Sequence, residues 1–413
     1  MKLVWSAALV AAVLAGCHSD SASHAMAWHG TVDTLGDTIV VTTVSGWTGN
    51  DTAAAVVDSV APFSAGAELN RPSSMVRLAN GDLIVVDVDH LVRIGPDGAV
   101  RGTIGRQGSG PGEFQQIGGL GVTTGDTIMV FDTGNSRVTR FTANGDLVDS
   151  RTSALHFTNT GFSDGARIPA TGDIVIGGMG PFHRNGSPTA FAVEVQRAGS
   201  DSVEVVDSLV GPSFVMKGSG SSGVMMLGPR DLFDRVPMFA VSNDGKVAAT
   251  DGLDYCIEVD SIGAGRHRRV CRQFARVPVT DAVRHPDIDA VAQRIGMSDA
   301  QRKSYTQMIG SIHVGDTHNA ISRVQFDDAG RLWVRIVDSA QAGVHPWLAA
   351  RDASLRPAHY VWDVFGRDGR QAGRVLLPST FDPREIMGDT VYGILELDTG
   401  EQVVGKGVVR HGP

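Results

Sequence analysis

Basic residues are scarcer than acidic residues in this chain. Its 413 residues include 36 Lys and Arg against 45 Asp and Glu, which gives a formal net charge of −9. No basic stripe stands against that balance, and the His-Arg-Arg run at 267–269 is too short to form one. A nucleic-acid partner is therefore not expected.

Aromatic residues are also few, at 6% of the chain, whereas glycine is abundant, with 51 residues. This combination is typical of many short strands joined by tight turns. Apolar residues make up 42% of the chain, which is enough for a large buried core. The composition predicts an all-β protein.

The apolar run at the N-terminus is short. It extends from Leu3 to Leu14 after Lys2 and ends in Leu14-Ala15-Gly16-Cys17. A run of this length does not span a bilayer comfortably and is typical of a secretion signal. The last four residues resemble a bacterial lipobox, which implies cleavage before Cys17 and lipid attachment to its thiol. An ordinary signal peptide with an incidental cysteine is the alternative.

The residues after Cys17 indicate a location. His18 stands where an aspartate would favour retention in the inner membrane, so the outer membrane is expected if the source is Gram-negative. We interpret residues 1–17 as signal peptide and lipobox, 18–29 as a flexible tether and 30–413 as the folded domain. The protein is expected in the cell envelope, on its periplasmic or extracellular side, and bound to the membrane only through the lipid.

A turn marker recurs along the chain: Gly followed by Asp, Lys or Arg and then by an apolar run. Each copy predicts a tight turn that opens a strand. The copies begin at Gly81, Gly125, Gly172, Gly245, Gly330 and Gly388. An additional copy at Gly36-Asp37 lacks a strand-rich unit of its own, so a seventh unit remains an alternative.

The unit from Gly105 to Val148 is the most complete. Alternation and turn residues predict strands over Leu120–Thr123, Thr127–Phe131, Arg137–Phe141 and Leu147–Arg151. Its glycine-rich start and its Asp-x-Gly-Asn-x-Arg turn resemble an NHL repeat, through Gly105, Gly108, Gly110, Pro111, Gly112, Glu113, Phe114, Asp132, Gly134, Asn135, Arg137 and Phe141. This resemblance implies a β-propeller, and the markers together predict six blades.

The ends of the chain are predicted to meet in the last blade. That blade has strands at Thr390–Leu397 and Val403–Arg410 and then stops, so it lacks an outer strand. We expect residues 54–60 to supply this strand, which ties the N-terminal part of the domain to the last blade. The segment Thr38–Val44 is expected to pair outside it.

Cys256 and Cys271 lie in two alternating segments around a glycine-rich loop. If the two cysteines face each other across an antiparallel ladder, the same register pairs Glu258 with Arg269, Asp260 with His267, and Ile257 with Val270. We predict a disulfide, because an exported protein occupies an oxidising compartment. Two buried free thiols are the alternative.

The long connections are predicted to gather at one end of the propeller. We letter the four strands of a blade a to d in chain order. The connections from b to c, and from d to strand a of the next blade, lie at the same end of an antiparallel blade, and every long segment is one of these two kinds of connection. The segments are Arg106–Gln116, Pro181–Pro188, Gly211–Arg235, Pro278–Asn319 and Ser339–Pro357. Functional residues are therefore expected at this end.

One of these segments, about 279–311 between blades 4 and 5, is predicted to form a helical hairpin. Pro286–Ile295 has apolar residues at helical spacing, and Ser298-Asp299-Ala300-Gln301 is a capping-box pattern that opens a helix to about Ile309. The hairpin would act as a lid over the propeller mouth or as a plug that covers apolar surface.

Two candidate metal sites follow from loop residues. His313, Asp316 and His318 could bind zinc or a similar divalent ion. Amidating lyases, six-bladed relatives of the NHL type, hold zinc by axial histidines, although their surrounding motifs are not found here. Calcium-dependent lactonases use acidic and asparagine ligands, and Asp132, Asn135, Asp251 and Asp254 hold corresponding turn positions. These four are explained more simply as turn formers, and no cofactor is otherwise expected.

Residues suited to recognition collect on the elaborated end, since aromatic and arginine side chains commonly anchor binding surfaces. They are Phe182, His183, Arg184, Arg302, Tyr305, Trp347, Arg351 and Tyr360, together with the three metal candidates. The Gly-x-Ser-x-Gly pattern at 161–165 is followed by a strand rather than a helix, which argues against a hydrolase nucleophile. The sequence predicts a binding protein for a small molecule, glycan or peptide, without catalysis. A metal-dependent lyase or lactone hydrolase and an envelope scaffold are the alternatives.

Overall fold

The computed structural model describes residues 28–44, 55–57, 59–64, 68–155, 165–181, 183, 186–219 and 224–410. Cys17, with the predicted signal peptide and most of the tether, lies outside these residues. The predicted tether extends too far, because the Trp28 indole donates a hydrogen bond to Thr43 Oγ1 (3.1 Å) and contacts the Arg370 guanidinium. Trp28 and His29 therefore belong to the folded part.

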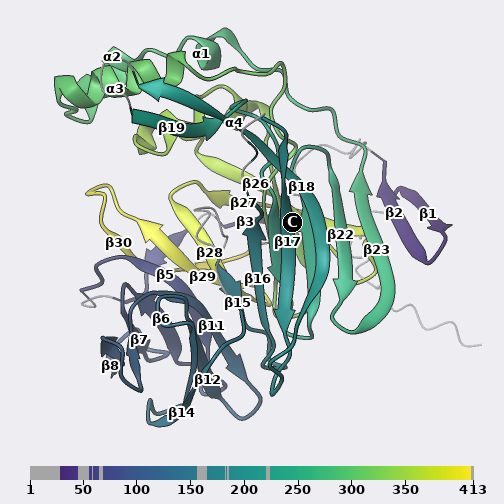
Figure 1. Ribbon diagram of the computed structural model, residues 1–413, viewed down its shortest axis with the longest axis vertical. Helices are drawn as coiled ribbons and strands as arrows, with labels where there is room; N and C mark the ends of the chain where they lie inside the picture. The colour runs from purple at the N-terminus through teal and green to yellow at the C-terminus, as the bar shows by residue number, and fades with distance from the viewer. Residues whose placement is uncertain are drawn as a thin grey trace, which may run out of the picture.

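Most of the described residues form antiparallel meanders that follow one another along the chain (Figure 1). The first comprises β5 Pro72–Arg77, β6 Leu83–Asp87, β7 His90–Ile94 and β8 Val100–Ile104. The second comprises β11 Ile117–Thr123, β12 Thr127–Asp132, β13 Arg137–Phe141 and β14 Leu147–Thr152. The third comprises β15 Ala166–Arg167, β16 Ile174–Met179, β17 Pro188–Gln196 and β18 Val203–Ser219.

Three further meanders complete the described chain. The fourth comprises β20 Met238–Val241, β21 Lys246–Thr250, β22 Cys256–Ser261 and β23 Ala264–Arg272. The fifth comprises β24 Ile321–Phe326, β25 Leu332–Ile336, β26 His359–Phe365 and β27 Gln371–Pro378. The sixth comprises β28 Phe381–Met387, β29 Thr390–Glu396 and β30 Gln402–Val408, with β4 Val60–Pro62 as its fourth strand.

Every predicted turn marker joins the first two strands of a meander. At the second marker, Gly125 and Asp126 have φ angles of 82° and 57°. Positive φ at both central residues is the geometry of a tight hairpin turn whose twist matches that of the strands. The four strands predicted for the second meander are confirmed, with one to three additional residues at some ends.

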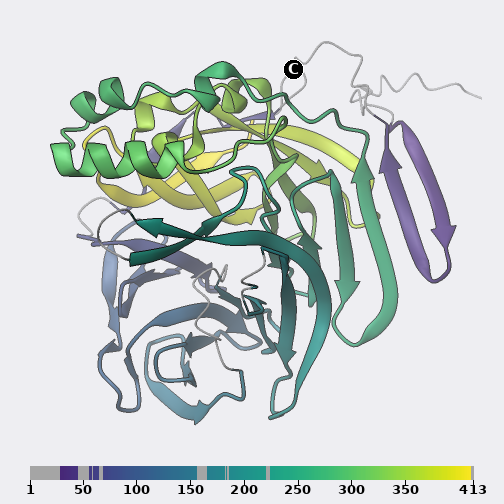
Figure 2. The same cartoon turned by 45° about the horizontal axis from the view of Figure 1, so that its top comes forward.

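The hydrophobic core lies between neighbouring meanders rather than at one centre. Each of six buried clusters takes its residues from two successive sheets. One of them packs Met75 and Val85 of the first meander against Tyr392 and Val404 of the sixth. The first strands of successive meanders are also neighbours, and β11 pairs with β15 in parallel. This radial arrangement of meanders is that of a β-propeller (Figure 2).

The N-terminal strands are placed differently from the prediction. β3 Ala55–Val56 pairs in parallel with β27 of the fifth meander, and it is β4 that pairs with β30 of the sixth. The hairpin of β1 Gly30–Leu35 and β2 Thr38–Thr43 lies along β23 of the fourth meander, not outside the last one (Figure 2). The N-terminal part of the folded chain therefore supplies edge strands to three sheets.

The disulfide and its register are confirmed. The sulfurs of Cys256 and Cys271 are 2.06 Å apart. Ile257 faces Val270 with both side chains buried, and the predicted charge pairs form on the same ladder. Arg269 Nε lies 2.5 Å from Glu258, and the His267 ring lies 2.5 Å from Asp260.

The long connections hold the helices and short additional strands. The predicted hairpin is confirmed as α2 Ile288–Arg294 and α3 Asp299–Gly310, and Ser298 and Gln301 form both hydrogen bonds of the capping box. The short segments α1 Asp281–Arg284, α4 Ser339–Ala342, α5 Pro346–Ala349 and η3 Ala353–Leu355 were not predicted. β9 Arg106–Gln107 and β10 Glu113–Phe114 form a two-stranded sheet, and β18 extends into a hairpin with β19 Val224–Pro229.

Among the described residues, no helix is both long and apolar enough to cross a bilayer. The helices gather at one end of the sheets, and β19 lies beside them (Figures 1 and 2). They pack on each other through Val291, Ile309 and Leu348. The hairpin therefore covers the apolar side of the fifth meander's α4–η3 insertion, which favours the plug interpretation.

Candidate functional site

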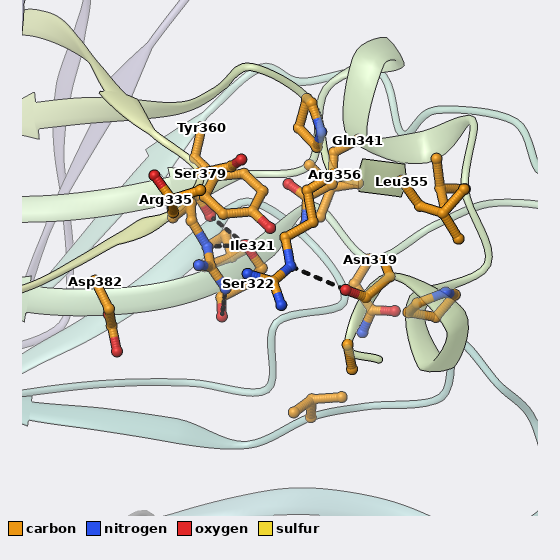
Figure 3. A pocket seen from close by; sticks show the side chains of 18 of the residues that line it. Asn319, Ile321, Ser322, Arg335, Gln341, Leu355, Arg356, Tyr360, Ser379 and Asp382 are labelled. Atoms are coloured by element: carbon orange, nitrogen blue, oxygen red, sulfur yellow. Dashed lines mark hydrogen bonds between the residues drawn. The ribbon is translucent and has the colours of Figure 1, made fainter. Parts of the chain in front are cut away.

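A cleft of about 600 Å³, which we term the main cleft, lies at the helix-bearing end of the described structure. Its walls come from the inner strands of the fourth, fifth and sixth meanders, from Pro72 of the first, and from the α4–η3 insertion (Figure 3). The wall is mixed. Its apolar residues include Phe233, Met238, Ile321, Val337, Leu355 and Ile394, and its polar residues include Asn319, Arg335, Gln341, Arg356, Ser379 and Thr380. A cavity of this size and lining is typical of small-molecule sites.

Arg335 of β25 is the charged residue at the back of this cleft. Its Nε donates to Ser322 Oγ (2.8 Å) and its Nη2 to the Ser322 carbonyl (3.4 Å). The guanidinium lies over the Tyr360 ring, 4.7 Å from its centroid, and 5.9 Å from that of Trp362 (Figure 3). Burial, together with the charge of Arg323, lowers the pKa of Arg335 to about 10.

The carboxylate of Asp382 lies nearby but is shared by two other arginines. Arg323 Nη1 donates to its Oδ1, and Arg384 Nη2 donates to its Oδ2 at 2.6 Å. Both oxygens therefore accept a charged hydrogen bond from a residue other than Arg335. Three guanidinium groups thus gather around a single carboxylate.

Arg356 is the second arginine that points into the cleft, and it is paired. Its Nη1 lies 2.8 Å from Glu396 Oε2, and its Nε donates to the Ala349 carbonyl (2.9 Å). The ion pair connects the α4–η3 insertion to β29 of the sixth meander. Arg356 therefore holds one wall of the cleft in place while its charge is neutralised.

The three predicted metal candidates do not meet at one point: His313 and Asp316 line one shallow cleft, whereas His318 lines the main cleft. His318 is 4% exposed, and its ring packs on Phe233, with centroids 4.1 Å apart. His313 is exposed and pairs with Asp231 (2.7 Å), while the fully exposed Asp316 pairs with Arg284 (3.0 Å). The described residues contain no group of three His, Cys, Asp or Glu side chains that could hold one metal ion.

The acidic turn residues act as the simpler interpretation predicted. Asp132 is 1% exposed and accepts hydrogen bonds from the backbone amides of Gln115, Gln116, Gly134 and Asn135. Arg137 of the same turn donates to the Ser109 carbonyl (2.7 Å).

Most of the predicted recognition residues join parts of the insertions. Arg351 Nε donates to the Tyr305 hydroxyl (2.6 Å), and Arg302 pairs with Asp289 (2.8 Å). Trp347 packs in the small core between the helices. His183 is exposed, and Phe182 and Arg184 lie outside the described residues. Of the sequence candidates that the structure describes, His318 and Tyr360 line the main cleft.

The charged residues of the cleft were missed by sequence reasoning. Arg335 interrupts a strand, Leu332–Ile336, whose other residues are buried. An arginine in such a strand was the available signal, because a charge on a buried strand calls for a partner or a function. Arg356, Asp382 and Glu396 gave no comparable signal, since each lies near a turn or a strand end.

The architecture places the chain among the β-propeller proteins. No family model and no curated protein matches the chain. Similar solved structures include a member of the DUF4221 family from Bacteroides vulgatus, which is 9% identical over 88% of this chain and 100% of that chain (TM-score 0.48).

Two more similar structures have comparable scores. A Bacteroides fragilis protein assigned as exported is 12% identical over 91% of this chain and 100% of that chain (TM-score 0.45). A gluconolactonase from Xanthomonas campestris is 11% identical over 85% of this chain and 89% of that chain (TM-score 0.41). Likeness at this level concerns the fold and does not transfer an activity.

Proposed function

We propose that this chain is an exported, six-bladed β-propeller that binds a small organic ligand in the 600 Å³ cleft, without catalysis of its own. The observation that carries the proposal is the cleft itself: it has the volume of a small-molecule site, its walls combine apolar side chains with convergent polar groups, and it lies at the end where the helices of the described chain gather. A filled, flat apolar cap would instead favour a scaffold for a protein partner.

The blade number rests on the packing of the sheets. The described residues form six meanders, and the buried cluster between the first and the sixth supports a closed ring. The Gly36-Asp37 copy of the turn marker forms the hairpin β1–β2, which adds to the fourth meander instead of making a seventh.

Export and lipid attachment at Cys17 complete the proposal, and they rest on the N-terminal sequence. The disulfide between Cys256 and Cys271 supports them, because disulfides persist in an oxidising compartment. We propose the cell envelope as the location, with the outer membrane as the site of anchoring. Mass spectrometry of membrane-extracted protein tests the lipid attachment. The expected mature chain begins at Cys17, lacks residues 1–16 and carries a diacylglyceryl group on the Cys17 thiol.

The enzyme alternative has weaker support in the described residues. His313 and Asp231 form an exposed pair in a second, shallower cleft of about 420 Å³, away from His318. The histidines and aspartates that the alternative requires do not converge on one point. Binding in the main cleft is therefore the reading that the geometry favours.

Binding of N-phenyl-1-naphthylamine, a neutral dye that fluoresces in apolar cavities, tests the proposed site. We expect one dye to bind per chain and Ser379→Phe, which fills the cleft from the sixth-meander side, to weaken binding at least tenfold. Ser208→Phe, on the exposed face of β18, is the matched control and should bind as the wild type does. Equal binding by Ser379→Phe would place the dye elsewhere and refute the site.

A further inference from the structure

Arg335 has no carboxylate partner, although it is largely enclosed by protein. Its side-chain hydrogen bonds go to the hydroxyl and carbonyl of Ser322, and none of the ion pairs among the described residues includes it. A cation removed from water without a counter-charge is costly. Arg272 shows the usual solution, because its guanidinium lies 2.5 Å from the buried Asp363.

The charge of Arg335 persists at neutral pH. Burial lowers its pKa only to about 10, which is still well above the pH of the envelope. The guanidinium therefore stays protonated, and the protein does not relieve the cost by releasing a proton. The faces of Tyr360 and Trp362 compensate part of this charge, and an anion from outside the chain would compensate the rest.

The carboxylate nearest in the cleft does not fill this role. Both oxygens of Asp382 accept hydrogen bonds from Arg323 and Arg384, so the three arginines outnumber the acid. The second acid, Glu396, is paired with Arg356. Although the whole chain is acidic, this part of the cleft therefore carries an excess of positive charge.

The surroundings of Arg335 define the chemistry of the missing anion. The guanidinium is held by Ser322 and by the faces of Tyr360 and Trp362, so its orientation is set before a ligand arrives. A planar guanidinium fork matches a carboxylate in a bidentate geometry. The apolar side chains of the wall suit a hydrocarbon chain or ring.

We propose that the ligand is an amphipathic monocarboxylate whose carboxylate pairs with Arg335 and whose apolar body lies against Phe233, Met238 and Ile394 in the cleft. This inference rests on the proposed function, because it names the ligand class of the same site. The Ser322 hydroxyl accepts from Arg335 Nε (2.8 Å) and donates its own proton to the Arg335 carbonyl (3.3 Å), so it orients the guanidinium and the ligand carboxylate pairs with Arg335.

Matched acids and amides test this proposal by displacing N-phenyl-1-naphthylamine. The pairs are octanoate with octanamide and 3-phenylpropionate with 3-phenylpropanamide, so that only the charge differs within each pair. We expect each acid to displace the dye at a concentration at least tenfold lower than its amide, because a charged hydrogen bond in an enclosed site exceeds a neutral one by about that factor.

Variants of Arg335 then locate the preference. In Arg335→Met the acid-to-amide ratio should fall to about one while the amides bind as before, and Arg335→Lys should retain part of the ratio. Arg101→Met removes one exposed arginine of the first meander and should leave the ratio unchanged. The difference between the displacing concentrations of each acid and its amide, measured on the wild-type protein, tests the ligand class even if a variant fails to fold.

The remaining outcomes separate the two proposals. If acids and amides compete equally, the carboxylate inference is wrong and binding in the cleft still stands. If neither acids nor amides displace the dye, and the dye binds Ser379→Phe as tightly as it binds the wild type, the proposed function is wrong as well. Acid preference that survives in Arg335→Met would refute the assignment to Arg335. Tenfold stronger competition by octyl phosphate than by octanoate would refute a monocarboxylate.

Discussion

The second and fifth meanders each place an aspartate near the end of an apolar second strand, and they use it differently: Asp132 is the last residue of β12, and Asp338 follows the end of β25 by two residues. Asp132 binds the backbone of the chain entering its own meander, as Asp87 does for Asn70 and Arg71 in the first. Asp338 caps the helix α4, which starts an insertion, and accepts from the Gln341 amide (2.9 Å). Asp132 therefore holds a short connection close to its own sheet, whereas Asp338 begins a long helical insertion.

This difference locates the cleft. Where the aspartate closes the connection, the strands leave little room above the sheet. Where it caps α4, the chain continues through α5 and η3 before it returns to β26. The fifth-meander insertion supplies Gln341, Leu355 and Arg356 to the cleft wall. We expect the two regions to differ also in how much each aspartate contributes to the free energy of unfolding.

Asp132→Ala is expected to have the largest effect. Four backbone amides and the Asn135 side chain lose their acceptor, so the free energy of unfolding should fall by about 4 kcal/mol. Asp338→Ala removes one helix cap and should cost about 1 kcal/mol. Urea titration followed by circular dichroism measures both.

Asp132→Asn serves as the control for this comparison. It keeps one carbonyl oxygen and should lose about half as much stability as Asp132→Ala. If Asp132→Ala and Asp338→Ala lose the same free energy of unfolding, the two aspartates contribute equally to stability and the contrast between the regions is wrong.

The features that could be predicted from the sequence are those set by neighbours along the chain. The turn at Gly125-Asp126, the capping box of Ser298 and the ladder through Cys256 and Cys271 each depend on residues within about one hairpin or one helical turn. A single register satisfied the cysteine, charge and apolar pairs together. Such agreement between independent signals is why these predictions were confirmed.

The features that failed depend on distant surfaces. The edge that receives β2 is set by which outer strand is unpaired after folding, and the hairpin's own alternation does not report that. Similarly, Trp347 and Tyr305 read as recognition residues because the core that buries them is made only when α3 and α5 meet. The cleft arginines are visible as a cluster only once β24, β25 and β28 are placed together.

The buried His345 predicts a pH effect in the fifth-meander insertion. It is 1% exposed, neither ring nitrogen has a hydrogen-bond partner among the described residues, and burial lowers its pKa from 6.5 to about 4. Between these values the unfolded chain binds a proton that the folded chain does not. Stability is therefore full above about pH 6.5 and decreases as the pH falls toward 4, by about 2 kcal/mol at pH 5.

Urea titrations at pH 7 and pH 5 measure this loss, and His345→Leu should remove most of it. Because both nitrogens are unpartnered, the leucine variant should be as stable as the wild type at pH 7. His183→Leu, at an exposed position, is the matched control and should keep the wild-type pH dependence. The lowered pKa of His318, caused mainly by burial, predicts a smaller remaining slope. An unchanged slope in His345→Leu would show that this histidine is not the source.

Ser298→Ala should have the smallest effect, and it tests whether the helical insertion unfolds separately from the sheets. The variant loses the capping box of α3, which is worth about 1 kcal/mol. Since Ile309 is the buried residue of this helix, its contacts with the sheets are few. We expect amide hydrogen exchange within α3 to accelerate about fivefold while the urea midpoint of the whole protein is unchanged. Ser298→Thr keeps the hydroxyl and should exchange as the wild type does. A shifted midpoint in Ser298→Ala would mean that the insertion and the sheets form one cooperative unit, and the contrast between elaborated and regular connections would then be one of shape alone.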